Sequence, residues 1–170
     1  MAKQSKVKTN AMRLLDKRHI PYTAFTYPET LHSAPEVAQA LDVPVDQVFK
    51  TLVVFADEGW PLLVVAPGNR ELEPRLVAHA VGAKQVHMAP RREAERLTGL
   101  KVGGISPLAL LDKHFAIYLD ESAAGLEEIY INGGQRGVNL RLRVTDLLAV
   151  TGAKLIRATD GSEQVGESEV

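Results

Sequence analysis

The stretch 50–66, KTLVVFADEGWPLLVVA, carries the strongest fold signal in the chain. It contains two apolar runs, residues 51–56 and 62–66, separated by the short segment Asp57-Glu58-Gly59. Acidic residues followed by glycine are typical of tight turns, and continuous apolar runs of this length are typical of strands covered on both faces. The stretch therefore predicts a buried β-hairpin.

Working outward from this hairpin, hydrophobic periodicity and capping residues predict helices and strands in irregular alternation. Helices are expected over residues 10–18 (capped by Thr9 or Asn10), 33–41, 74–81, 90–97 and 145–150. Strands are expected over 22–27, 85–88, 115–119, 129–131 and 138–142, with an edge strand at 155–156. The elements lack a strict βαβ rhythm and several strands are linked as hairpins. This pattern favours a single α+β domain with a mixed sheet over a doubly wound fold.

The two ends of the chain differ in composition from its middle. Residues 1–9 carry Lys3, Lys6 and Lys8 and no apolar run, so a flexible basic arm is expected there. Residues 10–157 are expected to form the folded domain, and the polar, acidic residues 158–170 a disordered tail. The sequence contains no secretory signal and no apolar run long enough to span a membrane, so a cytoplasmic location is expected by default.

The charge balance does not by itself indicate a nucleic-acid partner. The chain of 170 residues has a net charge of -1, from 20 Lys and Arg and 21 Asp and Glu. The tail 158–170 holds four of the acidic residues and no basic one, which leaves 20 basic and 17 acidic residues elsewhere. Three of the basic residues lie in the arm, so the folded part is nearly neutral, whereas strong nucleic-acid binders usually have a basic surface.

Several familiar chemistries are excluded by the residues themselves. The chain has no cysteine, which excludes disulfides, cysteine–zinc sites and a cysteine nucleophile. The segment 104–108 begins like a nucleophile elbow, but Leu108 stands where glycine is required and Pro107 lacks an N–H for an oxyanion hole. The segment 133–137 lies between expected strands and so is not a dinucleotide fingerprint. The five histidines are scattered, and His32 with Glu36 straddles a helix start, so no metal site is expected.

Three features remain as candidates, and each also has a purely structural interpretation. Lys50 lies at the start of an apolar, buried strand. It is either a lysine whose aliphatic stem is buried while its amino group reaches solvent, or a fixed cation at the rim of a pocket. The segment 103–107, GGISP, is either a tight turn or a backbone that a substrate can approach closely. The segment 132–137, NGGQRG, has three glycines and is either a wide hairpin loop or part of a site.

Taken together and in order, these segments resemble the YbaK family of free-standing tRNA-editing proteins, relatives of the insertion domain of bacterial prolyl-tRNA synthetases. The matching motifs are FKTL (49–52), TG (98–99) followed by VGGISPL (102–108), and IY (129–130) with GG (133–134) and RG (136–137). The resemblance extends from about residue 12 to residue 156. It implies a mixed, partly barrel-like β-sheet surrounded by helices and hydrolysis of the ester that joins a wrong amino acid to the tRNA 3′ end.

The resemblance also implies roles for individual residues. The lysine matched by Lys50 is the one most associated with activity; it would line the pocket and hold the terminal nucleotide. The backbone of Gly103 and Gly104 would position the aminoacyl carbonyl. Substrate contacts are expected from a wider set: Tyr27, Thr51, Ile105, Ser106, Asn132, Gly133, Gly134, Arg136 and Asn139. No cofactor is implied; the implied partners are the tRNA acceptor end and, for tRNA selectivity, prolyl-tRNA synthetase.

The substrate and mechanism remain open between alternatives. In the YbaK branch, the thiol of a cysteine charged onto proline tRNA attacks its own ester. Many relatives carry serine, lysine and an acidic residue where this chain has Asn132, Gln135 and Asn139, which leaves open the editing of alanyl- or seryl-tRNA by water attack. A non-catalytic module that binds tRNA or a synthetase, and a small-molecule esterase, are the remaining alternatives.

Overall fold

The hairpin forms the two central strands of the molecule, β3 (Phe49–Ala56) and β4 (Trp60–Pro67), which pair antiparallel along their whole length. We describe it from a computed structural model that places residues 2–4, 7–31 and 33–163. Both faces of the hairpin are covered, because Val53 and Leu63 belong to one apolar cluster and Val54 and Val64 to another. The expected buried hairpin is therefore confirmed.

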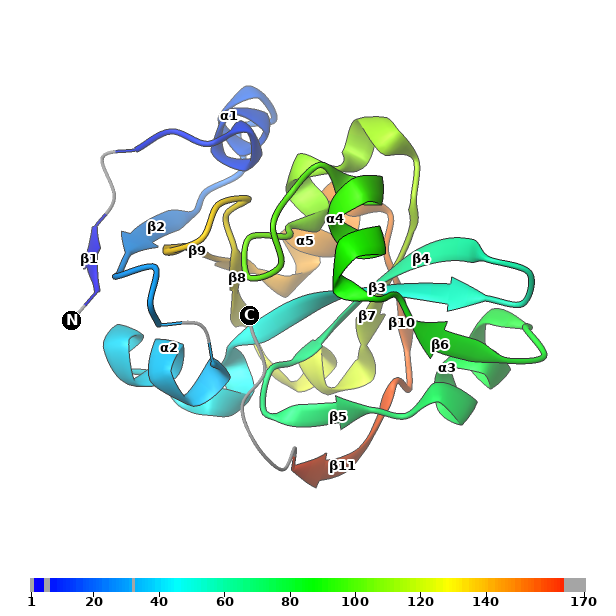
Figure 1. Cartoon of the computed structure of the whole chain (residues 1–170). Helices are drawn as coiled ribbons and strands as arrows, with labels where there is room; N and C mark the ends of the chain where they lie inside the picture. Colours follow the sequence, from blue (N-terminus) through cyan, green and yellow to red (C-terminus); the bar gives the residue numbers. More distant parts are fainter. Residues whose placement is uncertain (1, 5–6, 32, 164–170) are drawn as a thin grey trace.

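Five strands form the largest sheet, in the order β10-β7-β4-β3-β6 (Figure 1). The additional strands are β6 (Val86–Met88), β7 (Ala116–Asp120) and β10 (Lys154–Ile156). β3 pairs antiparallel with β4 and β6, whereas β7 pairs parallel with β4 and β10. The sheet is thus mixed. The expected edge strand at 155–156 is β10, one of the two edge strands of this sheet.

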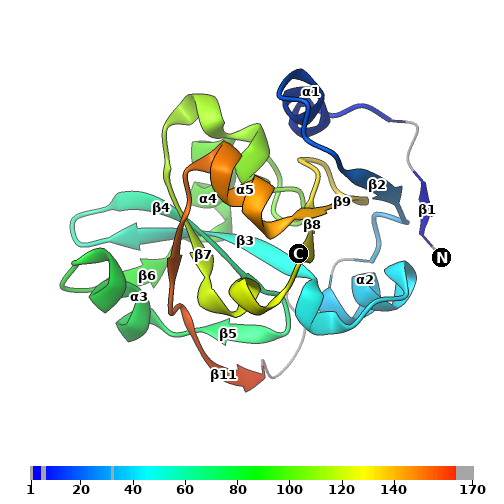
Figure 2. The ribbon, with the colours of Figure 1, turned by 180° about the vertical axis from the view of Figure 1, so that it is seen from behind.

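The second sheet has the order β1-β2-β9-β8 and is entirely antiparallel. Its members are β1 (Lys3–Gln4), β2 (Thr23–Thr26), β8 (Glu128–Asn132) and β9 (Val138–Arg143). A third, two-stranded sheet joins β5 (Arg70–Leu72) to β11 (Thr159–Glu163). Figures 1 and 2 show these sheets from opposite sides, with the helices around them.

The first three helices begin at residues whose side chains accept hydrogen bonds from their first backbone N–H groups. The Thr9 hydroxyl accepts a hydrogen bond from the Met12 N–H at the start of α1 (Asn10–Lys17). Ser33 and Glu36 form the expected capping box at the start of α2 (Ala34–Leu41): the Glu36 N–H donates to Ser33 Oγ, which donates to the Glu36 carboxylate. The other helices are α3 (Pro74–Val81), α4 (Arg91–Thr98) and α5 (Val144–Thr151).

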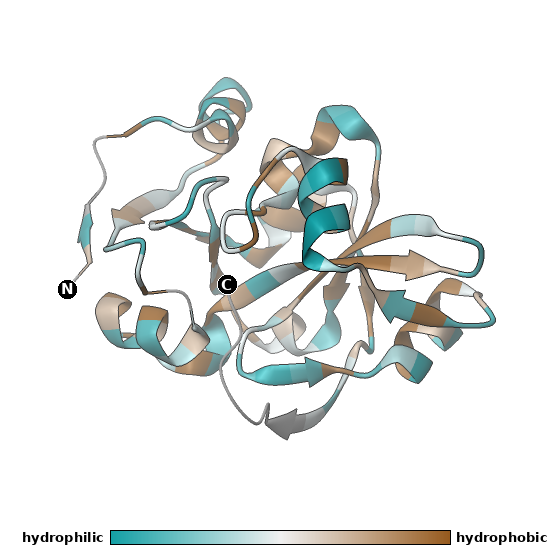
Figure 3. Ribbon diagram, viewed as in Figure 1, coloured by the Kyte–Doolittle hydropathy of each residue, from teal (hydrophilic) through white to brown (hydrophobic). Residues whose placement is uncertain are grey.

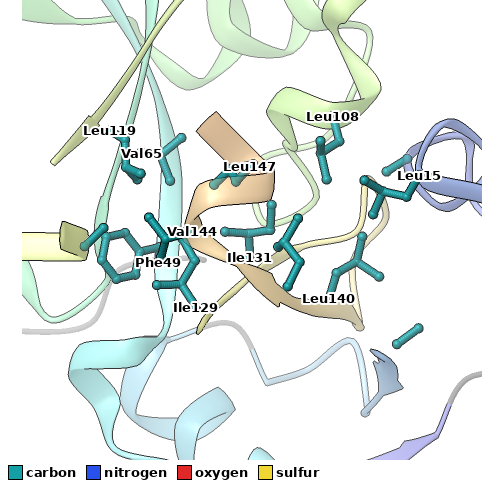
Figure 4. Close-up of a cluster of buried hydrophobic side chains, with 14 of the residues drawn as sticks. Leu15, Phe49, Val65, Leu108, Leu119, Ile129, Ile131, Leu140, Val144 and Leu147 are labelled. Carbon is teal, nitrogen blue, oxygen red and sulfur yellow. The ribbon is translucent and has the colours of Figure 1, made fainter. Parts of the chain in front are cut away.

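Apolar side chains from both larger sheets meet in the interior. Figure 3 shows β3 and β4 as largely hydrophobic and α4 as largely hydrophilic, with only its inner side apolar. In the cluster of Figure 4, Phe49 from β3 packs with Ile129 and Ile131 from β8 and with Leu147 from α5. The two sheets thereby share one core, which confirms the expected single-domain α+β class. Within the described residues the sheets do not close into a barrel.

Both ends of the chain differ from the expected boundaries. Within the expected flexible arm, Lys3 and Gln4 pair with β2 and the Ala2 N–H donates to the Ala40 carbonyl. Within the expected acidic tail, residues 159–163 form β11. Ala158 is fully buried, and its N–H and that of Thr159 donate to the buried carboxylate of Asp120. The first residues of the expected tail are therefore ordered, because their N–H groups donate hydrogen bonds to Asp120. The remaining residues of the expected tail, 164–170, lie outside the described residues.

Candidate active site

Strands from the two larger sheets, β3 and β8, meet at one point and then diverge. Val48, just before β3, forms an isolated parallel bridge with Tyr130 of β8. Lys50 and Asn132, each two residues further along, therefore lie at matching positions, and only 3% and 1% of their surfaces are exposed. Polar and charged side chains are rarely buried to this degree in a strand without a specific reason. The point of divergence is therefore the centre of the candidate site.

Asn139 of β9 and Tyr27 extend the same polar face. Asn139 lies directly opposite Asn132 in the β8–β9 pair and opposite Phe25 in the β2–β9 pair. Directly opposed residues project to one face, and so do alternate residues along a strand. The Tyr27 N–H donates to the Gly137 carbonyl at 2.9 Å, so Tyr27 continues the pairing of β2 beyond Phe25 on that face.

The apolar neighbours of these residues connect the face to Lys50. Tyr27, Val48 and Tyr130 pack in one buried cluster beneath α2. Val48 is on the same face of its strand as Lys50, and Tyr130 is on the same face of β8 as Asn132. Lys50, Tyr27, Asn132 and Asn139 therefore border a common region, and the structure brings together four of the residues expected at the site.

Burial shifts the protonation equilibria of two groups in this region. Burial lowers the pKa of Lys50 to about 8, and the nearby carboxylate of Glu71 on β5 partly opposes this shift. Burial raises the pKa of Tyr27 to about 12, which the adjacent Asn139 side chain partly opposes. At neutral pH Lys50 is therefore mostly protonated but can release its proton easily, and Tyr27 is neutral.

The amide of Asn139 is the least satisfied polar group of the face. The residue is fully buried, and neither its nitrogen nor its oxygen makes a hydrogen bond of good geometry within the described structure. A buried polar group without a partner costs about 1–3 kcal/mol. Such a cost is typical of a group that binds a ligand, because an apolar side chain of the same size at position 139 would make the fold more stable.

Two loops are locked together beside this face. Asn132 Nδ2 donates to the Gly103 carbonyl at 2.6 Å, and Asn132 Oδ1 accepts from the N–H groups of Gly134 and Gln135 at 2.7 and 3.1 Å. Arg136 Nε donates to the Val102 carbonyl at 2.8 Å. The loops 102–106 and 132–137 therefore form one unit, in which Asn132 and Arg136 fix the backbone and Gly133 and Gly134 form the turn.

The glycines of the first loop have a structural explanation. A Cβ atom on Gly104 would lie 2.9 Å from the backbone nitrogen of Arg136, so only glycine allows the two loops to approach this closely. Gly103 has a φ of 92°, which also favours glycine. The Gly104 N–H donates to the Lys101 carbonyl at 2.7 Å. Because the Gly104 donor is already used, the expected role of this backbone in positioning the aminoacyl carbonyl stays a prediction for Gly103 only.

Thr51 and Ile105 lie on the other side of β3 from Lys50. They line a pocket of about 260 Å³ together with Val53, Met88 and Gly103. Ser106, which was expected to contact substrate, is instead fully buried, and its hydroxyl accepts from the Leu108 N–H at the start of a short 3-10 helix. Ser106 therefore shapes the loop and is not part of the polar face.

Comparison with known proteins assigns this architecture to a family. The sequence profile of the aminoacyl-tRNA editing domain matches residues 28–150. The chain belongs to the aminoacyl-tRNA editing domain family. The match includes Lys50, the GGISP loop and both asparagines, and Tyr27 directly precedes it.

Individual relatives of this editing-family protein align with most of its residues. An Enterococcus faecalis protein, provisionally named Cys-tRNA(Pro)/Cys-tRNA(Cys) deacylase EbsC, is 35% identical over 159 residues, which cover 92% of this chain and 96% of the relative. The proline–tRNA ligase of Staphylococcus saprophyticus is 29% identical over 71% of this chain, which corresponds to 20% of the ligase. A solved structure provisionally described as a trans-editing enzyme for prolyl tRNA synthetase has a TM-score of 0.76 at 28% identity, over 92% of this chain and 100% of that one.

Sequence reasoning missed one residue beside the candidate site, Glu71. This carboxylate lies on β5, a short strand that the sequence did not predict, and it acts electrostatically on Lys50. An exposed glutamate between two turns gives no sequence signal of this kind. Among the described residues, no cluster of His, Asp or Glu could hold a metal ion, and none of the helices there is long and apolar enough to cross a membrane. His32 lies outside the described residues.

Proposed function

We propose that this protein deacylates mischarged aminoacyl-tRNA as a free-standing trans-editing enzyme, with cysteine on proline tRNA as the preferred substrate. The observation that carries the proposal is the buried polar face of Lys50, Tyr27, Asn132 and Asn139, which lies within or beside the region matched by the editing family. The names of the Enterococcus faecalis relative and of the similar solved structure support the choice of substrate.

In the proposed reaction the nucleophile comes from the substrate. The cysteine sulfur attacks its own ester carbonyl, a carbon–sulfur bond forms, and the bond to the ribose oxygen breaks. The proton of the thiol passes to that oxygen, so the tRNA leaves with a free hydroxyl and the amino acid leaves as a cyclic thioester. Holding sulfur and carbonyl in attack geometry can lower the barrier by roughly 7–11 kcal/mol in favourable cases.

The site residues support this route through positioning and charge. Lys50 holds the terminal nucleotide as a fixed cation, and the backbone at Gly103 positions the aminoacyl carbonyl. The amide of Asn139 supplies a donor and an acceptor to the substrate. No protein nucleophile is needed, which is consistent with a chain without cysteine and with a Ser106 hydroxyl that serves its own loop.

The neutral amides of Asn132 and Asn139 favour a second candidate substrate, alanine or serine attached to tRNA. These amides stand where many relatives carry serine and a carboxylate, so the amino-acid preference of this chain can differ from theirs. In that case a water molecule held on the same face would attack the ester.

One experiment separates these possibilities: single-turnover deacylation of proline tRNA charged with cysteine, serine or alanine. A thiol has a pKa near 8.5, whereas a serine hydroxyl provides essentially no alkoxide at neutral pH. The thiol route therefore clears cysteine far faster than serine or alanine. Equal rates would point to water attack, and clearance of alanine alone would identify an alanine editor. No clearance of any of them would leave a binding module, and cleavage of simple esters without tRNA would identify an esterase.

The nearly neutral charge is compatible with recognition of the acceptor end alone, which involves few phosphates. We propose that prolyl-tRNA synthetase supplies the tRNA selectivity and that the reaction takes place in the cytoplasm. Addition of the synthetase should then increase the rate on proline tRNA relative to cysteine tRNA.

A further inference from the structure

The segment that joins β2 to α2 places a carboxylate against one loop of the candidate site. The Tyr27 N–H donates to the Gly137 carbonyl at 2.9 Å, so these two residues lie opposite each other just beyond the β2–β9 pair. Glu29 follows within a turn in which the Leu31 N–H donates to the Pro28 carbonyl. Glu29 therefore lies where the chain leaves β2 and turns toward α2 (Figure 1).

Gly137 allows this turn to approach the loop 132–137 closely. Its φ is 78°, and a Cβ atom there would lie 2.6 Å from the Tyr27 carbonyl oxygen and 3.4 Å from Glu29 Cγ. A larger residue at position 137 would push Glu29 away from the loop. Glu29 thus packs on the backbone of Gly137, two residues before Asn139, and no side chain of residue 137 stands between them.

Glu29 and Asn139 together offer hydrogen-bond acceptors and a negative charge. Glu29 is exposed, and among the described residues no Lys or Arg forms an ion pair with its carboxylate. Asn139 is fully buried, and its amide oxygen makes no hydrogen bond of good geometry. A carboxylate and an amide oxygen both accept hydrogen bonds, so together they match a ligand group that donates and has a positive charge.

The spacing of these residues suits an ammonium group. Positions two residues apart in a strand are separated by about 6.8 Å. One ammonium that donates hydrogen bonds of about 2.9 Å to two acceptors spans roughly this distance. Asn139 lies opposite Asn132 of β8, and Lys50 belongs to the next strand, β3, so position 50 is roughly 10 Å away. An ammonium at Glu29 and Asn139 is therefore kept apart from the Lys50 cation.

We propose that Glu29 and Asn139 bind the α-ammonium group of the aminoacyl ester, and that Glu29 thereby selects esters whose amino group is free. The inference rests on the proposed function, because it assigns one group of that substrate to a place in the site. Glu29 is a specificity-determining residue, since it holds the ammonium and takes no part in making or breaking bonds. An ester whose nitrogen is acylated, as in peptidyl-tRNA, has no charge there and is excluded.

The test compares two esters of proline tRNA that differ only in the amino group, cysteinyl-tRNA and 3-mercaptopropionyl-tRNA. The wild-type protein should have a KM at least fivefold lower for the cysteinyl ester. Glu29→Gln should abolish this preference in KM without changing the ratio of the two kcat values, and Glu29→Asp should keep part of it. The comparison of two esters cancels any general effect of a lost carboxylate on the attraction of tRNA phosphates. For an alanine editor, alanyl- and propionyl-tRNA make the same comparison.

The matched control is Glu58→Gln, the same exchange at an exposed glutamate in a separate groove at the opposite end of β3. It should keep the wild-type preference. An unchanged preference in Glu29→Gln, or an equal rise in KM for both esters, would overturn the proposal.

If the wild-type protein clears no aminoacyl-tRNA, the proposed function fails by itself, and cysteine methyl ester then serves as the probe. A shift of the Gly137 amide signal in NMR titrations of the wild-type protein that is weakened in Glu29→Gln would still support the ammonium site. No shift, or the same shift in both proteins, would reject it.

Discussion

At the scale of single residues, the site keeps polar groups where the fold would be more stable without them. Lys50 is buried in a strand and has a lowered pKa, and Asn139 is buried without a well-formed hydrogen bond. Residues held at a cost to stability are typical of sites that bind or react. Substitution at these positions should therefore lower activity without a matching loss of stability.

Replacement of Lys50 by alanine should reduce the single-turnover rate of deacylation at least about tenfold, which corresponds to about 1.4 kcal/mol of transition-state stabilisation. The reason is the loss of the fixed cation at the point where β3 and β8 diverge. Lys84→Ala, an exposed lysine in the groove at the far end of the sheet, is the control and should act like the wild-type protein. A folded Lys50→Ala protein with an unchanged rate would remove Lys50 from the site.

The lowered pKa of Lys50 makes stability depend on pH. Between pH 8 and 10.5 the unfolded chain binds the Lys50 proton and the folded chain has largely released it, so the free energy of unfolding should rise as the pH rises through this window. The total gain is limited to about 3 kcal/mol, because one pKa unit corresponds to about 1.4 kcal/mol.

Chemical denaturation of the wild-type protein and of Lys50→Met between pH 7 and 10 measures this effect as the difference between the two proteins. The upper limit avoids the titration of Tyr27, whose raised pKa gives stability that is lost above pH 10. A constant difference across the range would show that Lys50 keeps its ordinary pKa.

Replacement of Asn139 by leucine should change thermal stability little. It removes a buried amide that makes no well-formed hydrogen bond and keeps the side-chain size, but it also takes the amide away from the Tyr27 hydroxyl. Deacylation should fall about tenfold or more, since the substrate loses a donor and an acceptor. Thermal melting and single-turnover kinetics of the same preparation measure both quantities. A lower melting temperature with an unchanged rate would indicate a purely structural asparagine.

At the scale of elements, the site depends on two loops that fit only because one residue has no side chain. The loop 102–106 follows α4, and the loop 132–137 joins β8 to β9. Two hydrogen bonds, from Asn132 to Gly103 and from Arg136 to Val102, hold the loops together, and two more within 132–137 fix the turn. Gly104 lies at their closest approach. Because the loops are in direct contact, a change at Gly104 should displace Asn132 and the polar face.

Gly104→Ala should therefore lower the free energy of unfolding by roughly 1–3 kcal/mol, because its Cβ would lie 2.9 Å from a backbone nitrogen that cannot move aside freely. The rate of deacylation should fall with it. Gly125→Ala is the matched control, because a Cβ there meets nothing within 4 Å. Equal stability of the two variants would show that the loops are not in close contact.

The sequence predicted the elements whose signals are local, and missed the arrangements that depend on distant partners. The 50–66 hairpin, the capping box at Ser33 and the class of the sheet follow from periodicity and capping, and all are confirmed. Lys50 was a candidate because of its place in an apolar strand, and the segment with Asn132 because of its three glycines, whereas Asn139 was identified through the family resemblance alone. The influence of Glu71 on Lys50 could not be predicted, because it depends on where β5 lies relative to β3.

At the scale of the whole molecule, the C-terminal segment closes the structure next to the site. Asp120, at the end of β7, accepts hydrogen bonds from the N–H groups of Ala158 and Thr159 at 2.9 and 3.1 Å. Strand β11 then pairs with β5, opposite Leu72 and Arg70, and these residues flank Glu71. The segment thus fixes the short strand whose Glu71 carboxylate opposes the pKa shift of Lys50, and links residues 158–163 to the candidate site.

A chain that ends at Arg157 should consequently be less stable and less active. Its Asp120 carboxylate, 1% exposed in the folded protein, would lose the two backbone donors, at a cost of about 1–3 kcal/mol for each unsatisfied group. For a protein of this size each kcal/mol lowers the melting temperature by roughly 2–4 °C, so a fall of about 5–10 °C is expected. A chain that ends at Glu163 keeps both donors and the β5 pairing, and should melt within about 2 °C of the full chain. The chain that ends at Arg157 could instead have the same melting temperature as the longer chains and clear cysteinyl-tRNA at the same rate. That result would show that the hydrogen bonds of Asp120 do not stabilise this segment.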